Sequence, residues 1–388
     1  MKYYNSLTNA LMQWRNFAPL KTVIMIRIFV PLLVAAVTLL NTASPVITVS
    51  KHANADTVQY PAETHFKNVR QLTFGGDNAE AYFSYDGKYL IYQRTDPDNG
   101  IMCDQIWMGK IPENPGETFN PKLVSTGTGR TTCAYFFPDG KHIIYASTHL
   151  SSKDCPPVPD KEKEKRYIWP IYESFDLFIA DTSGNIVKQL TTTDGYDAEA
   201  TISPKGDKIV FTSMRNGDLD LYTMNIDGSN VKQITSAPGY DGGAWFSPDG
   251  SKIVWRASRP KTAAEIADYN ALLARGLVAP TSMEVWIANA DGSDAHQITN
   301  LGKANWAPNF MPDGKHIIFC SNHEYERGFP FNMYITDING KGLVKVSRDK
   351  GFDAFPMFSP DGKRIVFGSN RNNGGTHSTN LFIADWAQ

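Results

Sequence analysis

The chain has 388 residues, of which 41% are hydrophobic and 20% charged, and its formal net charge at pH 7 is −2. This composition is typical of a folded globular protein and excludes a predominantly disordered chain. The near-neutral charge provides no broad basic surface, so no nucleic-acid partner is expected.

The first 55 residues differ in character from the rest of the chain. Four basic residues come before an apolar run over residues 28–40, and a small-residue A-x-A motif follows at residues 53–55. This order is typical of a signal peptide, whereas the run extended back to Thr22 is long enough for a membrane anchor. Both alternatives stay open, and both predict export, to the periplasm or beyond, with membrane contact only through this segment.

Six later stretches share one pattern, a strand, a tight turn of the Pro-Asp-Gly type and a second strand. They begin at Phe83, Phe136, Ile202, Phe246, Phe310 and Phe358. Glycine supplies the positive φ that lets the chain reverse direction at the turn. The second strand is apolar on both faces, as in "KIVFTS", which predicts a strand covered on both sides. A third strand, an Asn/Asp-Gly turn and a short segment of the "KQIT" type complete each repeat.

Repeats of four antiparallel strands predict an all-β protein, a six-bladed β-propeller over residues 66–388. The last repeat ends after its third strand, "NLFIADW", and the missing fourth strand is found ahead of the first repeat as "NVRQLT". We therefore expect residues 66–73 to complete the last blade and close the ring. The predicted blades cover residues 78–127, 131–193, 197–237, 241–301, 305–348 and 353–388.

The "SPDGK" hairpin followed by "DGSN" and "QIT" resembles the repeat of the TolB-like β-propeller family, also described as WD40-like or PD40 repeats. The resemblance implies a non-catalytic, monomeric propeller that binds a protein or peptide partner in the cell envelope, with a Tol-type role in envelope integrity or translocation. TolB proteins carry an α/β domain ahead of the propeller, and we expect none between the leader and the first repeat here.

The longest insertions are predicted on the rim opposite the Pro-Asp-Gly turns. They cover residues 148–174, 259–283, 322–331 and 370–379. Within the second, Thr262 and Glu265 form a capping box that predicts a helix ending at Gly276. Because loops on a rigid scaffold are where binding usually resides, this rim is the expected functional face.

Three blades carry an Asp before the first strand and an Arg 18 residues later, just after the second strand. The pairs are Asp197 with Arg215, Asp241 with Arg259, and Asp353 with Arg371. Both members should lie on the same rim, so we expect structural ion pairs.

Histidines replace this Arg in two other blades, at His149 and His323, and His377 lies in the loop of blade six. Three imidazoles facing one funnel would suit a divalent metal, which is the basis of an alternative function, a metal-dependent carbohydrate lyase or hydrolase. Ordinary loop hydrogen bonds are the other interpretation, and on that interpretation no cofactor is expected.

Glu80 and Glu199 begin innermost strands and are expected at the channel mouth beside Cys133. There they would hold a cation or a basic peptide group, or be satisfied by water and backbone amides. The remaining candidates for the binding face are Asp96, Arg130 and Trp169.

Four cysteines are compatible with a disulfide in an exported protein. Cys103, Cys133 and Cys155 should fall near one rim, where we expect two of them to be joined. Cys320 lies in a buried strand and is interpreted as a small apolar residue.

No G-x-S-x-G, Walker, H-E-x-x-H or dinucleotide-binding motif is present, which favours a binding module over an enzyme. A third hypothesis is a sensor with a closed pocket beneath the 148–174 and 259–283 insertions.

Overall fold

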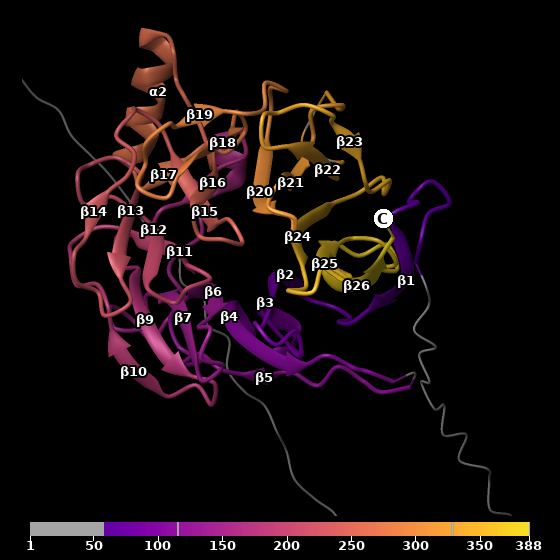
Figure 1. Cartoon of the computed structure of the whole chain (residues 1–388). Coiled ribbons are helices and arrows are strands. Elements are labelled where there is room, and N and C mark those ends of the chain that lie inside the picture. The colour runs from indigo at the N-terminus through magenta and orange to yellow at the C-terminus, as the bar shows by residue number, and fades with distance from the viewer. Residues whose placement is uncertain (1–57, 115, 327, 329, 388) are drawn as a thin grey trace, which may run out of the picture. The chain divides into compact units, whose positions relative to one another are not determined.

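The computed structural model describes residues 58–114, 116–326, 328 and 330–387, and within them six four-stranded antiparallel sheets are arranged around a ring (Figure 1). The predicted six-bladed propeller is thereby confirmed, whereas the predicted leader, residues 1–55, lies outside the described residues. The strands of each blade run from the axis outward in chain order, except that the last blade takes its outermost strand from the start of the described chain.

Blades one to three have the following strands: β2 (Asp77–Phe83), β3 (Tyr89–Asp96), β4 (Ile101–Lys110) and β5 (Lys122–Leu123); β6 (Thr131–Phe136), β7 (His142–Ser147), β9 (Asp176–Asp181) and β10 (Ile186–Gln189); β11 (Asp197–Ile202), β12 (Lys208–Ser213), β13 (Asp220–Asn225) and β14 (Lys232–Gln233). Blades four to six follow: β15 (Asp241–Phe246), β16 (Lys252–Ala257), β18 (Glu284–Asn289) and β19 (His296–Gln297); β20 (Asn305–Phe310), β21 (His316–Ser321), β22 (Asn332–Asp337) and β23 (Val344–Lys345); β24 (Asp353–Phe358), β25 (Arg364–Ser369), β26 (Asn380–Trp386) and β1 (Phe66–Gln71).

The ring is closed by the antiparallel pairing of β1 with β26, in which Phe66 faces Trp386 and Arg70 faces Ile383. Phe66 is fully buried and stacks on Phe367 of β25 at 5.3 Å. Pairing with β1 covers the outward edge of β26, so that blade six has four strands like the other blades.

The Pro-Asp-Gly turns are held by their own side chains. In blade four the Asp249 carboxylate accepts hydrogen bonds from the hydroxyl of Ser247 at 2.6 Å and the amide of Ser251 at 3.0 Å, and Gly250 has a φ of +73°. The turn is therefore specified locally, which is why its recurrence in the sequence predicts the hairpins so well.

The core lies between the blades, where the second strands are covered on both faces. Ile253, Val254 and Trp255 of β16 are all fully buried. At the centre of the ring, Tyr82 and Tyr135 pack edge-on against Trp245 with ring centroids 4.7 and 4.9 Å away. These three residues come from the innermost strands of three blades, so their contact places an aromatic cluster on the axis.

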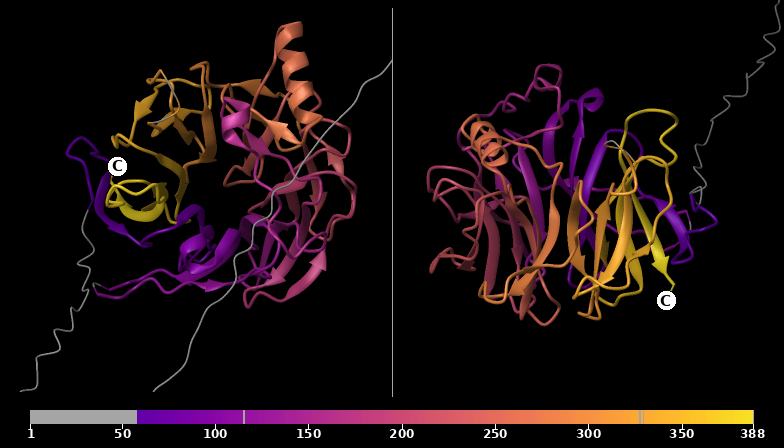
Figure 2. Two further views of the ribbon diagram at one scale, coloured as in Figure 1. Left: turned by 180° about the vertical axis from the view of Figure 1, so that it is seen from behind. Right: turned by 90° about the horizontal axis from the view of Figure 1, so that it is seen from above.

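Longer loops project on one side of the ring, as the side view in Figure 2 shows. They include the short helix α1 (Lys161–Glu164), the helix α2 (Ala263–Leu273) and two extra strands, β8 (Trp169–Pro170) and β17 (Leu277–Val278); a 3-10 turn, η1 (Pro97–Asn99), links β3 to β4. The capping box of Thr262 and Glu265 is confirmed at the start of α2. In the described part of the chain, no helix has the length and apolarity to cross a membrane.

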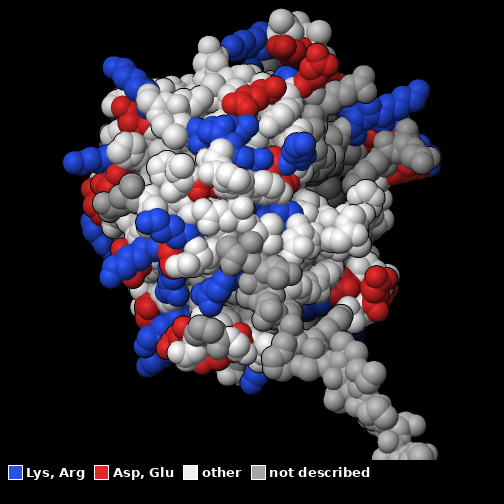
Figure 3. Space-filling view, turned by 90° about the vertical axis from the view of Figure 1, so that its right-hand side faces the viewer, with Lys and Arg blue, Asp and Glu red and all other residues white. Residues whose placement is uncertain are grey.

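Basic and acidic side chains are interspersed on the face of the propeller that Figure 3 shows. This mixture agrees with the net charge of −2 and gives that face no field of a single sign.

Candidate functional site

The innermost strand of every blade carries one residue in the left-handed region of backbone conformation. The six equivalent residues are Glu80, Cys133, Glu199, Gly243, Ala307 and Phe355, with φ between 48° and 62°. Each lies at a break in the strand register, for example between Ala198 and Thr201, and is therefore part of a β-bulge. Bulges of this kind redirect a side chain and are common beside functional sites. Here all six residues line one central cavity.

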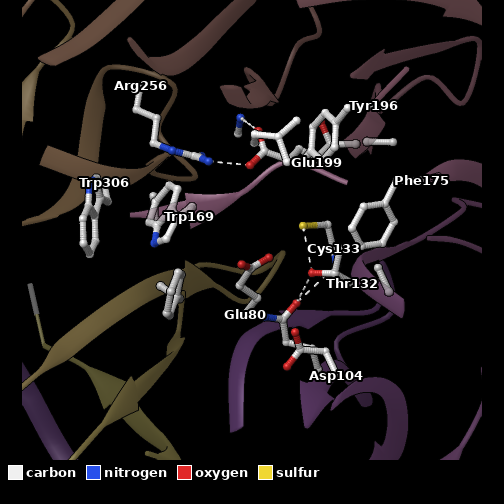
Figure 4. A pocket seen from close by; sticks show the side chains of 18 of the residues that line it. Glu80, Asp104, Thr132, Cys133, Trp169, Phe175, Tyr196, Glu199, Arg256 and Trp306 are labelled. Carbon is white, nitrogen blue, oxygen red and sulfur yellow. Dashed lines mark hydrogen bonds and ion pairs between the residues drawn. The ribbon is translucent and has the colours of Figure 1, made fainter. Parts of the chain in front are cut away.

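The cavity has a volume of about 340 Å³ and is lined from every blade of the ring. Tyr82 and Trp245 of the axial aromatic cluster form part of its wall, and so do Trp306 and Phe355. Figure 4 shows Glu80 and Glu199 around the same space as the rings of Trp169 and Trp306. A mostly apolar concave site with a few convergent polar groups is the usual form of a ligand site.

A lid contributes a further part of the wall. We use this term for residues 148–174 together with residues 259–283, the insertions of blades two and four. Strand β8 of the first pairs with β17 of the second, so that Trp169 faces Val278. Arg166 donates two hydrogen bonds to Asp268, at 2.7 and 3.0 Å, and Ile168 packs in one cluster with Leu272 and Leu277. The two insertions therefore brace each other across blade three.

Trp169 is the lid residue at the centre of the cavity wall. Its ring lies 5.0 Å from that of Trp306 and 5.3 Å from the guanidinium of Arg256, and its indole N–H donates to the hydroxyl of Tyr167 at 3.1 Å. Figure 4 shows Trp169 and Trp306 side by side. The lid is thus packed directly against the inner strands.

Glu199 is held by a dense set of contacts. Arg256 donates to one carboxylate oxygen at 2.5 Å, Tyr240 donates to the same oxygen at 2.7 Å, and the backbone amide of Gly243 donates to the other oxygen at 2.8 Å. Both side chains of the ion pair are about nine-tenths buried. A buried charge pair held by several hydrogen bonds is a structural element that also fixes the shape of the cavity, although the Nε atom of Arg256 has no hydrogen-bond partner among the described residues.

Glu80 has a different environment. Glu80 is half-buried and makes no ion pair with any described residue; its carboxylate accepts a long hydrogen bond, 3.4 Å, from the hydroxyl of Tyr82 and a second one from the thiol of Cys133. Burial, followed by repulsion from Glu199, raises the pKa of Glu80 to about 7. Its charge can therefore change near neutral pH.

A second ion pair and a thiol complete the polar lining. Arg130 donates to Asp104 at 2.5 Å. The amide oxygen of Gln93 accepts a hydrogen bond from the hydroxyl of Thr132 at 2.6 Å. Burial and the neighbouring Glu80 raise the pKa of the Cys133 thiol well above its ordinary value, so this cysteine stays neutral and is a poor nucleophile.

The structure joins Cys103 to Cys155, which are 52 residues apart, and leaves Cys133 and Cys320 as free thiols. The disulfide fixes the 148–174 insertion to β4 of blade one. Cys320 is fully buried.

All three Asp–Arg pairs are present, at 3.0 Å for Arg215, 2.6 Å for Arg259 and 2.9 Å for Arg371, measured from guanidinium nitrogen to carboxylate oxygen. Each Arg also lies over an aromatic ring of the third strand of its blade, as Arg215 does over Tyr222 at 5.0 Å. Arg215 additionally donates to the hydroxyl of Ser213, two residues earlier.

The hypothesis of a metal site at His149, His323 and His377 is wrong for this structure. No three His, Cys, Asp or Glu residues in the described part of the chain form a group that could hold a metal ion. His149 packs at a tilt against Phe178, with ring centroids 4.5 Å apart, and His323 packs in the same way against Tyr334 at 4.7 Å. Each histidine also contacts a serine two residues earlier at 3.0 Å. The two histidines thus replace the stacked Arg of the other blades.

Of the eight predicted binding-face residues, Glu80, Arg130, Trp169 and Glu199 line the cavity. The other four do not: Asp96 pairs instead with Arg94 at 2.5 Å, and the three histidines remain on their own blades. Sequence reasoning missed Arg256, Tyr240 and Trp306. Arg256 did have a signal, because it is a charged residue within the otherwise apolar second strand "KIVWRA".

Comparisons with known proteins agree with this architecture. The family model described as TolB beta propeller domain matches residues 172–273 and 277–378. The chain belongs to the TolB β-propeller domain family. No curated protein sequence matches it.

Solved structures similar to this TolB-like propeller share its fold at low sequence identity. The structure of putative TolB from Agrobacterium tumefaciens has a TM-score of 0.51 and 17% identity, over 81% of this chain and 91% of that one. TolB from Acinetobacter baumannii has a TM-score of 0.51 and 19% identity, over 79% of this chain and 66% of that one. Oligogalacturonate lyase in complex with manganese has a TM-score of 0.48 and 14% identity, over 86% and 96%.

Proposed function

We propose that this TolB-like propeller is a non-catalytic binding module that holds a protein or peptide partner of the cell envelope on its lid-bearing face. The observation that carries the proposal is the exposure of three large apolar side chains on the first lid insertion: Leu150 is 63% exposed, Val158 63% and Tyr167 42%. Large apolar side chains exposed on a braced loop can form a contact surface for a protein.

The lid suits such a role because it is rigid. Disulfide Cys103–Cys155, the β8–β17 pairing and the Arg166–Asp268 ion pair hold the first insertion at separate points. A contact surface that is ordered before binding loses less conformational entropy when a partner docks.

We also propose that the protein is exported and acts in the envelope, by analogy with Tol-type propellers. The basic and apolar order of residues 1–55 supports export, and so does the disulfide, because disulfides persist in oxidising compartments. The alternative of a metal-dependent lyase is not advanced, since the three histidines on which it depended do not meet.

Affinity capture from envelope extract tests the proposal. The exported protein would be compared with a Leu150→Glu/Val158→Glu variant and with a control, Ile186→Glu/Val187→Glu, which alters exposed residues on outer strand β10 of the same blade. Partners identified by mass spectrometry would then be purified and titrated against all three proteins. We expect the lid variant to weaken binding at least about tenfold and the control to bind normally. Equal binding by the lid variant would contradict the proposal.

A further inference from the structure

The charges that line the central cavity do not balance. Two ion pairs, Arg256 with Glu199 and Arg130 with Asp104, account for four of the charged side chains. The fifth is Glu80, and no lysine or histidine lines the cavity. When Glu80 is ionised, the site therefore carries one uncompensated negative charge in an enclosed space, which is an unfavourable state unless a cation joins it.

The walls around Glu80 are suited to a cation. Trp169, Trp306, Tyr82, Trp245 and Phe355 all line the cavity. The faces of aromatic rings carry partial negative charge and attract ammonium and guanidinium groups, most strongly in the case of tryptophan. The guanidinium carbon of Arg256 already lies over the Trp169 ring, 5.3 Å from its centroid, so this wall holds one cation as part of the fold.

The orientation of Glu80 is imposed by the backbone. Its φ of 53° at the β-bulge of β2 turns the side chain inward, and Figure 4 shows its carboxylate pointing into the space between Trp169 and Cys133. A left-handed conformation is unfavourable for a glutamate, and such conformations cluster at ligand-binding sites.

We propose that the cavity binds a small monocationic ligand, whose ammonium group pairs with Glu80 beneath the Trp169 ring while its apolar part lies along the aromatic wall. The volume of about 340 Å³ is at the lower end of the range for small-ligand pockets, roughly 300–1,000 Å³. This site is separate from Leu150 and Val158, the lid residues altered to test the protein contact, whereas Tyr167 lies at the cavity wall as well as on the exposed lid.

Ligand binding should depend on pH in a defined direction. With the cavity empty, burial and repulsion from Glu199 raise the pKa of Glu80 to about 7, whereas an amine stays protonated throughout this range. Of the other groups that face Glu80, Glu199 and Asp104 are held in ion pairs with Arg256 and Arg130. Tyr82 and Cys133 are neutral, because burial raises the pKa of each well above its ordinary value. Affinity for a cation should therefore rise between pH 6 and pH 8.

Calorimetric titration of the full chain with phenethylamine tests the proposal, with 2-phenylethanol as the neutral analogue of the same shape. We expect saturable 1:1 binding of the amine, about tenfold tighter at pH 8 than at pH 6, and at least about tenfold weaker binding of the alcohol. Glu80→Gln should remove both the preference for the amine and the pH dependence. Glu173→Gln, which alters an exposed glutamate of the lid, should retain both.

The ammonium group has two sources, a free amine or the lysine of a peptide, and acetyl-Gly-Lys-Gly-amide titrated alongside distinguishes them. If either compound binds the parent and that binding is lost in Glu80→Gln, the proposal is supported, and the compound that binds identifies the source. Absence of binding by both, equal binding of amine and alcohol, or an unchanged Glu80→Gln variant overturns it. Thermal melting of Glu80→Gln verifies the fold. Amine binding by the Leu150→Glu/Val158→Glu variant separates this test from that of the protein partner.

Discussion

Arg371 and Glu63 lie 308 residues apart in sequence and form a two-point ion pair in which both side chains are 0% exposed. Arg371 also pairs with Asp353 of its own blade at 2.9 Å. Glu63 precedes the closing strand β1, so this contact fastens the start of the described chain to blade six beside the β1–β26 pairing. The ring is thus closed by a buried charge network as well as by backbone hydrogen bonds.

The buried network predicts a large effect of removing Glu63. Glu63→Ala leaves Asp353 as the one carboxylate paired with Arg371 among the described residues, and it removes the acceptor for the backbone amide of Arg348. We expect the free energy of unfolding to fall by about 3 kcal/mol, the lower end of the range for a broken buried ion pair. Urea unfolding measures this fall. Glu113→Ala, in an exposed pair with Lys110, should leave the midpoint unchanged, and equal midpoints for both variants would contradict the assignment.

Glu80 should make the unliganded protein less stable as pH rises. Its pKa of about 7 in the folded state lies above the ordinary value of 4.5, so between these values the folded state binds more protons than the unfolded state. The free energy of unfolding therefore decreases from about pH 4.5 to about pH 7 and then levels. The free energy of unfolding of Glu80→Gln should equal that of the parent near pH 4.5. At pH 8 it should be higher than that of the parent by up to about 3 kcal/mol. A difference that does not change with pH would contradict this account.

The Cys103–Cys155 disulfide closes a long segment of chain, because the two residues are 52 apart in sequence. Cys155→Ser should lower the free energy of unfolding by about 2–4 kcal/mol. Limited proteolysis should then cut first within residues 148–174, which lose their link to β4. Cys133→Ser serves as the control. Because Cys133 is a free thiol, this variant keeps the disulfide, and a reductant should destabilise it as much as it destabilises the parent. A Cys155→Ser protein that resists the protease as the parent does would exclude a stabilising role.

Glu199 and Arg256 should show strong energetic coupling. Arg256→Met leaves a buried carboxylate without its cation, which costs about 3–5 kcal/mol, and Arg256→Met/Glu199→Gln should recover most of that loss. A double-mutant cycle by urea unfolding measures the coupling energy. The same cycle on the exposed pair Arg166–Asp268 should give a much smaller value. Similar coupling in both cycles would contradict the buried role of the first pair.

The sequence by itself determined the blades, the closing strand and the Asp–Arg pairs, because each depends on local or repeated chemistry. A Pro-Asp-Gly turn specifies its own hairpin, and residues 18 apart in one blade meet wherever that hairpin forms. Because Glu80, Cys133 and Glu199 occupy the same position in their repeats, the sequence also predicted that they lie together at the channel mouth. Their shared left-handed conformation and the β-bulge were visible only in the structure.

Only the tertiary structure decided which residues of different blades meet. Arg256 of blade four reaches Glu199 of the neighbouring blade three, Trp169 packs on Trp306, and β8 pairs with β17. None of these contacts repeats along the chain. The histidines were predicted to meet across blades, but His149 and His323 pack against rings of their own blades. Contacts between loops depend on how the blades curve around the axis and on how the insertions fold. Neither can be predicted from the repeats, because the insertions differ from blade to blade.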